Sequence, residues 1–192
     1  TSNTCIGHQA GSYSTNLVTG SGNTLIGSYA YTTATDTAAA QVFGHSVGGE
    51  AGYTTVGYAA NDIRAANGTA TWATVSDERY KKNITDSTAG LSFINDLRPR
   101  TFKYKNLGDL PEAFNAYEAD STEAYKNSDT NHGFIAQEVK TVIDAHSEIK
   151  DGFNLWDDRT DGSQEIGETA LIPMLVKAVQ ELSAKIKKLE EE

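Results

Sequence analysis

The chain has 192 residues and a formal net charge of −10, with 26 acidic against 16 basic side chains. This balance argues against a nucleic-acid-binding protein, which normally carries a basic patch, and the single cysteine, Cys5, excludes an intrachain disulfide. No apolar run approaches the roughly 20 residues of a membrane-spanning helix, and the first residues lack the composition of a signal peptide.

The first 75 residues are rich in glycine and poor in charge. They hold 11 of the 17 glycines and only four charged side chains, which are Asp36, Glu50, Asp62 and Arg64. The rest of the chain carries all three prolines and most of the charge. Because the composition changes near residue 75, we predict two domains, over residues 1–75 and 76–192.

A short unit recurs within the first region. It consists of a small or polar residue, two apolar residues, a glycine, a polar residue, any residue and a small residue. Its four copies begin at Thr4, Thr24, Gln41 and Thr54. Short β-rich units predict a β-solenoid or β-roll, and such units need neighbours to bury their apolar faces. With so few charges, we expect other copies of the chain to cover the surface. A disordered linker is the alternative, but such linkers rarely keep apolar residues in register with glycine.

The second region is predicted to be a small α+β domain, from helical spacing, alternation and turn residues. Pro99 ends its first helix, since the residue before proline avoids helical geometry. The expected elements are a helix over 89–97, a strand over 100–105, an irregular stretch over 106–131 with one helix around 112–126, a strand end and helix over 132–145, and an acidic, turn-rich stretch over 150–168.

The chain ends in a predicted long helix, over 171–192. Its apolar residues are spaced 3, 4, 3, 4 and 3 apart, and they are Ile172, Leu175, Val179, Leu182, Ile186 and Leu189. This heptad pattern favours a self-associating coiled coil over an amphipathic helix packed on its own domain. Ile or Val alternating with Leu locally favours two strands.

Ser76 and Lys81 lie five residues apart where the composition changes. A Ser–Lys pair can form a nucleophile without histidine. The lysine can act as a base only if burial or neighbouring cations, here Arg79 and Lys82, lower its pKa from about 10.4. Positions five apart do not share a helix face, so a turn must bring them together. Attack on the nearest carbonyl, that of Val75, would leave Ser76 as a new N-terminus.

Spacing alone favours a simpler interpretation of the same residues. Ser76 followed by two acids, Asp77 and Glu78, is typical of a helix N-cap whose first turn suits the helix dipole. Lys81 is then an ordinary solvated side chain.

Four motifs in order change that preference. They are SDERYKKNI at 76–84, LRPRTFKY at 97–104, GFIAQEV at 133–139 and LIPMLVKAVQEL at 171–182. The set resembles the endosialidase-type C-terminal intramolecular chaperone, a self-cleaving serine peptidase module of phage tailspikes and tail fibres, over about residues 76–189. The module also occurs in the myelin regulatory factor family. However, the repeats over 1–75 resemble phage-fibre β-rolls and trimeric adhesin heads, which favours the phage group.

The resemblance implies a single-turnover self-cleaving endopeptidase that assembles three fibre chains and then releases itself. In this reading Ser76 is the nucleophile, Lys81 is the general base, and the bond between Val75 and Ser76 is cut. Four further residues match the motifs without an assigned role, and they are Asp77, Asn83, Gln137 and Glu138.

The same resemblance implies a homotrimer in a virion tail, assembled in the host cytoplasm, with the chaperone part released after the cut. Because the sequence begins at Thr1 without a methionine, we expect upstream fibre domains. The fibre region leaves a host surface receptor as a further partner. We expect no nucleic-acid partner, no membrane insertion and no cofactor.

Two other functions compete with this interpretation. A non-catalytic trimeric adhesin or receptor-binding fibre tip would use the repeats and the helix, with Ser76 as a plain cap. A hydrolase acting on other molecules is disfavoured, because the chain has four histidines and no Gly-x-Ser-x-Gly elbow. Paired Cys/His spacing for a metal is absent from the sequence. His8 and His45 occupy equivalent repeat positions and are interpreted as outward polar residues.

Overall fold

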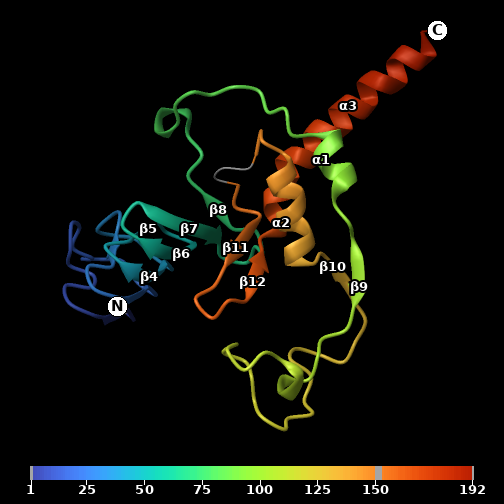
Figure 1. Cartoon of the computed structure of the whole chain (residues 1–192). Coiled ribbons are helices and arrows are strands. Elements are labelled where there is room, and N and C mark those ends of the chain that lie inside the picture. The colour runs from blue at the N-terminus through green and yellow to red at the C-terminus, as the bar shows by residue number, and fades with distance from the viewer. Residues whose placement is uncertain (1, 150–152, 192) are drawn as a thin grey trace. The chain divides into compact units, whose positions relative to one another are not determined.

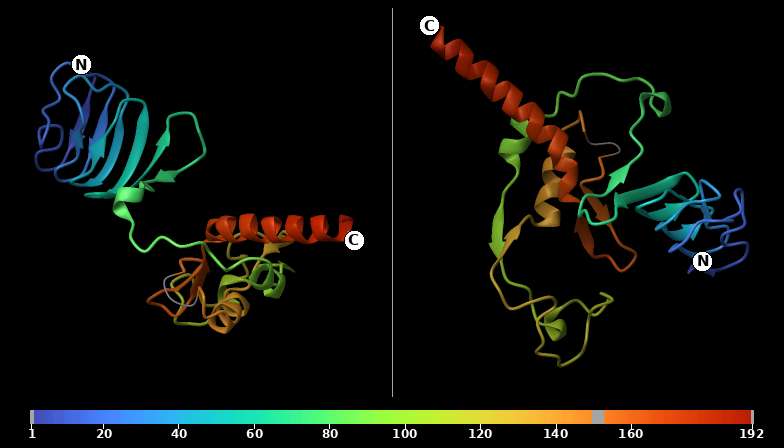
Figure 2. Two further views of the ribbon diagram at one scale, coloured as in Figure 1. Left: turned by 90° about the horizontal axis from the view of Figure 1, so that it is seen from above. Right: turned by 180° about the vertical axis from the view of Figure 1, so that it is seen from behind.

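The computed structural model describes residues 2–149 and 153–191. The chain forms two compact units, Thr1–Ile84 and Thr85–Glu192. The first is a stack of short strands and the second is a mixed α and β domain that ends in a long helix (Figures 1 and 2). The division by packing falls between Ile84 and Thr85, whereas the boundary at residue 75, drawn from the change in composition, stays a prediction.

The first unit has a β-solenoid-like arrangement, as the repeats predicted. Its main sheet has the order β1-β2-β4-β6-β7-β8, in which the first four strands are parallel and the last two pairings are antiparallel. A second, two-stranded sheet pairs β3 with β5. The strands are β1 (Thr4–Ile6), β2 (Thr24–Ile26), β3 (Tyr31–Thr32), β4 (Gln41–His45), β5 (Gly48–Gly49), β6 (Tyr53–Tyr58), β7 (Asn61–Ala66) and β8 (Ala73–Thr74).

Equivalent positions of the repeats form rows across the sheet. The second residue of each unit points inward, so Leu25 and Val42 are fully buried and pack with Ala30, Ala40 and Val47. The third residue alternates to the outer face, as strand geometry requires. The glycine of each unit approaches the next strand closely: a Cβ on Gly44 would lie 1.9 Å from the carbonyl oxygen of Gly57.

In its described residues, the second unit packs two short strand pairs and three helices around one core. Its elements are α1 (Leu91–Asp96), β9 (Arg100–Phe102), β10 (Asn131–Gly133), α2 (Ala136–Ala145), β11 (Trp156–Asp158), β12 (Gln164–Ile166) and α3 (Ile172–Glu190), with 3₁₀ turns at η2 (Leu107–Asp109) and η3 (Glu168–Leu171). Both strand pairs are antiparallel. The buried core is formed by Ala89, Phe93, Leu97, Val139, Ile143, Ile149, Leu155 and Leu171.

Most of the expected elements of this unit are present, but one is wrong. The helix expected around 112–126 is absent, and the chain there makes turns, such as the bonds from the Phe114 amide to the Pro111 carbonyl and from the Tyr117 amide to the Phe114 carbonyl. These hydrogen bonds join residues i and i+3, whereas an α-helix requires bonds between residues i and i+4. The turn-rich stretch over 150–168 holds the unexpected β11–β12 hairpin, and its residues 150–152 lie outside the described residues.

The final helix begins at Ile172, with Pro173 in its first turn, where a missing N–H costs no hydrogen bond. Its C-terminal half projects beyond the other elements of the second unit (Figure 2). The structure holds one copy, so the coiled coil stays a prediction, and residue 192 lies outside the described part. In the described residues, no helix has the length and apolarity needed to cross a bilayer.

Candidate active site

The segment that follows β8 folds into a tight turn within the first unit. A 3₁₀ turn, η1 (Glu78–Tyr80), begins two residues after Ser76. The Tyr80 amide donates to the Asp77 carbonyl at 3.1 Å, and the Lys81 amide donates to the Glu78 carbonyl at 2.9 Å. The backbone therefore reverses between Ser76 and Lys81, as a meeting of these two side chains requires.

The turn brings the two predicted dyad side chains into contact. Lys81 Nζ donates a hydrogen bond to Ser76 Oγ, with 2.7 Å between the two atoms. This distance suits proton transfer between a serine hydroxyl and a base. The carbonyl carbon of Val75 is one bond away from the Ser76 nitrogen, so the nucleophile and the expected scissile bond share one short segment.

Asp77, and not Ser76, caps the turn. An oxygen of its carboxylate accepts from the Arg79 amide at 2.8 Å and from Arg79 Nε at 2.9 Å, while the other oxygen accepts from Arg79 Nη2 at 2.7 Å. Arg79 holds the pKa of Asp77 below its usual value, mainly through the side-chain hydrogen bond, and the pKa of Arg79 is raised in turn. The simpler interpretation of Ser76 as the cap is therefore wrong.

The site is open to solvent in the single chain. The side chains of Ser76 and Lys81 are exposed, and Val75 is 56% exposed. Val75 and Tyr80 help to line a hollow of about 1410 Å³ along β6, β7 and β8. Asn83 follows with a φ of 55°, in the left-handed region that asparagine tolerates, and so turns the chain away after Lys82. The two side chains are therefore within hydrogen-bond distance of each other and both are exposed to solvent.

Glu138 has a structural contact in the second unit. Its carboxylate pairs with Arg100 through two bonds of 2.9 and 2.5 Å, and Arg98 lies 3.6 Å away. The hydrogen bond from Arg100 is the main cause that lowers the pKa of Glu138. This bidentate pair connects the first turn of α2 to β9. A structural role therefore accounts for Glu138 without a catalytic one.

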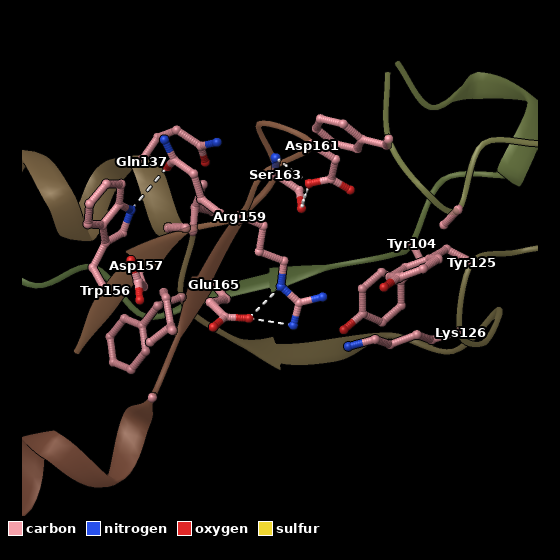
Figure 3. A pocket seen from close by; sticks show the side chains of 18 of the residues that line it. Tyr104, Tyr125, Lys126, Gln137, Trp156, Asp157, Arg159, Asp161, Ser163 and Glu165 are labelled. Carbon is pink, nitrogen blue, oxygen red and sulfur yellow. Dashed lines mark hydrogen bonds and ion pairs between the residues drawn. The ribbon is translucent and has the colours of Figure 1, made fainter. Parts of the chain in front are cut away.

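Gln137 faces a hollow of about 930 Å³ in the second unit (Figure 3). The hollow also contains Tyr104, Tyr125 and Lys126, whose ammonium lies 5.2 Å from the Tyr104 ring centre. Across it, Arg159 pairs with Glu165. This cluster could not be predicted from the sequence, because its residues come from α2, β12 and the segments that connect other elements, and they have no motif spacing.

Asp161, in the β11–β12 turn, accepts hydrogen bonds from the Asn115 amide and from Ser163. These bonds, with the Asn115 amide first, lower its pKa to about 2. The contact joins the hairpin to the irregular stretch over 106–131 and gives that stretch a fixed position without a helix. In the described residues, no cluster of three or more His, Cys, Asp or Glu side chains could hold a metal ion.

His146 is a further charged contact that the sequence analysis missed. Its two ring nitrogens each lie 2.9 Å from a carboxylate, of Asp96 on one side and Glu148 on the other. The hydrogen bond with Glu148, followed by that with Asp96, raises the pKa of His146. The ring also packs edge-on against Phe93, so the imidazole connects the end of α2 to α1.

Comparison with known proteins identifies the region that starts at Ser76. A family model described as the chaperone of endosialidase, a peptidase family, matches residues 76–148, which is less than half of the chain. No curated protein and no solved structure matches the sequence. The match begins at the residue predicted as the nucleophile, and it supports an endosialidase-type chaperone module over residues 76–148.

Proposed function

We propose that this chain is the C-terminal end of a phage tail fibre or tailspike whose chaperone module trimerises the fibre and then cuts itself off at Val75–Ser76. The observation that carries the proposal is the 2.7 Å contact between Lys81 Nζ and Ser76 Oγ at the start of the matched region. The solenoid-like repeats directly before it supply the fibre that such a module would release.

The cut can be written with all atoms balanced. Neutral Lys81 Nζ takes the proton from Ser76 Oγ as that oxygen bonds to the Val75 carbonyl carbon. The bond from this carbon to the Ser76 nitrogen then breaks, and the nitrogen takes the proton from Lys81. This leaves an ester between Val75 and the Ser76 side chain. Water hydrolyses the ester, which gives a Val75 carboxylate and a Ser76 with a free amine.

The chemistry requires Lys81 without its proton, whereas the ammonium form is favoured wherever the side chain is solvated. Both dyad side chains are exposed in the single chain. We therefore propose that other copies bury this segment during assembly, so that burial favours the neutral amine. A single chain would be held uncut for the same reason.

Two unpartnered apolar surfaces support self-association. On α3, the six heptad residues Ile172, Leu175, Val179, Leu182, Ile186 and Leu189 are 44–72% exposed. On the outer face of the first unit, Ile6, Ile26, Val56 and Ile63 are 37–58% exposed, and they share one paired row with Phe43, which is half-buried. Contiguous exposed apolar surfaces of this kind mark interfaces, and identical low-charge faces do not repel each other.

A fibre of this kind benefits from a removable chaperone. Repeats pair almost equally well with a wrong neighbour, so they specify register weakly. A trimeriser at one end raises the effective concentration of correct partners. Once the trimeriser is removed, the fibre cannot readily disassemble by the reverse of its assembly. It then persists because its unfolding barrier is high. The assembled fibre belongs to a virion tail, and the module is released in the host cytoplasm.

Intact-mass spectrometry of the purified chain tests the cut. We expect a fragment that begins at Ser76 from the wild type, and an intact chain of 20.6 kDa from Ser76→Ala and from Lys81→Ala. Complete cleavage of both variants would eliminate the dyad assignment.

The exposure of Ser76 and Lys81 favours a second candidate, a non-catalytic trimeric adhesin or receptor-binding tip. In that case the Lys81 contact only stabilises the turn. The wild type would then remain an intact 20.6 kDa chain under denaturing conditions, even after it has formed trimers.

A further inference from the structure

Burial contributes little to holding the turn between Ser76 and Lys81 in place. It is a single 3₁₀ turn of three residues, and none of these residues is buried. Isolated short turns of this kind are marginal in water, because few hydrogen bonds offset the fixed backbone angles. Hydrophobic packing therefore does not explain why Lys81 folds back onto Ser76.

Beside the two backbone hydrogen bonds of the turn, the side-chain contacts that hold it converge on one carboxylate. Asp77 accepts three hydrogen bonds, all from Arg79: one from its amide and two from its guanidinium. The amide bond satisfies one of the free donors at the start of the turn. The two guanidinium bonds form a fork, a geometry that lysine cannot reproduce.

The dyad residues flank this contact directly. Ser76 precedes Asp77, and Lys81 is the C-cap of the turn, with extended backbone angles of φ −115° and ψ 152°. A change in the turn therefore moves Lys81 relative to Ser76 with no intervening element to absorb the shift.

We propose that Asp77 and Arg79 are positioning residues that hold Lys81 Nζ on Ser76 Oγ for self-cleavage. The inference rests on the proposed function and gives Asp77 a role that the motif alone did not. Neither side chain contacts the dyad atoms. Because the guanidinium is engaged by Asp77, Arg79 serves the turn and is not an unpaired cation beside Lys81.

The test measures the rate of cleavage after refolding from denaturant, at chain concentrations where the rate no longer rises with concentration. Asp77→Ala removes the cap and the fork, and we expect it to slow cleavage about 100-fold, since a displacement of about 1 Å can have that effect. Asp77→Asn keeps an oxygen that can cap the turn, so we expect it to recover most of the rate, within about fivefold of wild type, because an exposed ion pair contributes little.

The matched control is Glu78→Gln. Glu78 is an exposed acid in the same turn, and in the described residues its side chain has no hydrogen bond or ion pair. We expect the wild-type rate from this variant. Arg79→Lys should behave like Asp77→Asn, since it keeps the amide and loses the fork.

The salt dependence of the cleavage rate is a readout that a merely structural role would not change. Salt screens an exposed ion pair, so the wild-type rate should fall toward that of Asp77→Asn as salt rises, while the Asp77→Asn rate stays constant. Light scattering on every variant shows whether assembly is intact. If Asp77→Ala fails to assemble, the rates of Asp77→Asn and Arg79→Lys and their salt dependence decide.

The outcomes separate the two proposals. Cleavage of Ser76→Ala at the wild-type rate overturns the proposed function. An uncut Ser76→Ala together with wild-type rates for Asp77→Ala and Arg79→Lys overturns the positioning role and leaves the self-cleavage intact. Equal loss in Asp77→Ala and Glu78→Gln also overturns it, because any charge change in the turn would then suffice.

Discussion

Replacing Gly44 with alanine tests the packing of the repeats. Gly44 has a φ of 138°, and a Cβ there would lie 1.9 Å from the Gly57 carbonyl oxygen, which belongs to the backbone of the next strand. The unfavourable backbone angle costs about 1–2 kcal/mol. The clash can be relieved only by shifting a paired strand, which adds about 1–3 kcal/mol as other overpacked sites do. We expect Gly44→Ala to lower the free energy of unfolding of the first unit by about 2–5 kcal/mol.

Gly52 provides the matched control. It also has a positive φ, of 75°, but a Cβ there would meet no atom within 4 Å. Gly52→Ala should therefore lower the free energy of unfolding only by the cost of the backbone angle, about 1–2 kcal/mol. The difference between the two variants isolates the close approach of neighbouring strands.

Tryptophan fluorescence during urea unfolding can measure this in the full chain. The first unit contains Trp72 and the second contains Trp156, so a Trp156→Phe background reports on the first unit alone. Ser76→Ala in the same background keeps the chain in one piece. The reasoning is refuted if Gly44→Ala is no more destabilising than Gly52→Ala, since the strands would then not be packed as the register requires.

Two further predictions concern assembly and pH. Val179→Asp places a charge on the exposed apolar stripe of α3 and should abolish self-association in analytical ultracentrifugation, whereas Gln180→Asp, one residue away and outside the heptad set, should not. Because Glu148 and Asp96 raise the pKa of His146, the imidazolium contacts stabilise the fold fully below the unfolded pKa of about 6.5 and lose that effect as pH rises through the folded value. Thermal unfolding should show this decline in the wild type and not in His146→Gln; equal pH profiles would contradict it.

The repeats made the first unit predictable from sequence. Its register follows from one pattern, in which an inward apolar residue such as Val42 precedes an outward one and then a glycine such as Gly44. The antiparallel end, β7 and β8, was not predicted, because these strands do not carry the repeat. Sequence periodicity predicts the equivalent strands of the repeats. It gives no information about the strands that end the sheet.

The second unit was predicted less completely, for a different reason. The β11–β12 hairpin contains acids at Asp157, Asp158 and Glu165, so it lacks the apolar alternation that indicates strands. The pairing is supported instead by contacts such as that between Arg159 and Glu165. These contacts depend on tertiary position, and neither composition nor spacing reports them.

The sequence indicated the residues of the candidate site but not the contacts that hold them in place. The family resemblance assigned the site to Ser76 and Lys81, and their spacing required a turn, which the structure contains. The acid after the serine was interpreted as a partner of the helix dipole, but Asp77 instead engages Arg79 in a fork. Two residues i and i+2 can make such a fork only in a specific turn, so the pairing follows from the fold and not from the pattern.

Geometry and desolvation are separate requirements of a Ser–Lys pair, and the single chain meets only the first. The Ser76–Lys81 distance is already 2.7 Å in one copy, so under the proposed function reaching that geometry does not set the time of the cut. The exposed segment lacks burial, which only a change in its surroundings can supply. The cut would then follow assembly, because assembly provides the one condition that the single chain does not. Under the proposed function, a chain that failed to find its partners would keep its chaperone module and remain competent to assemble.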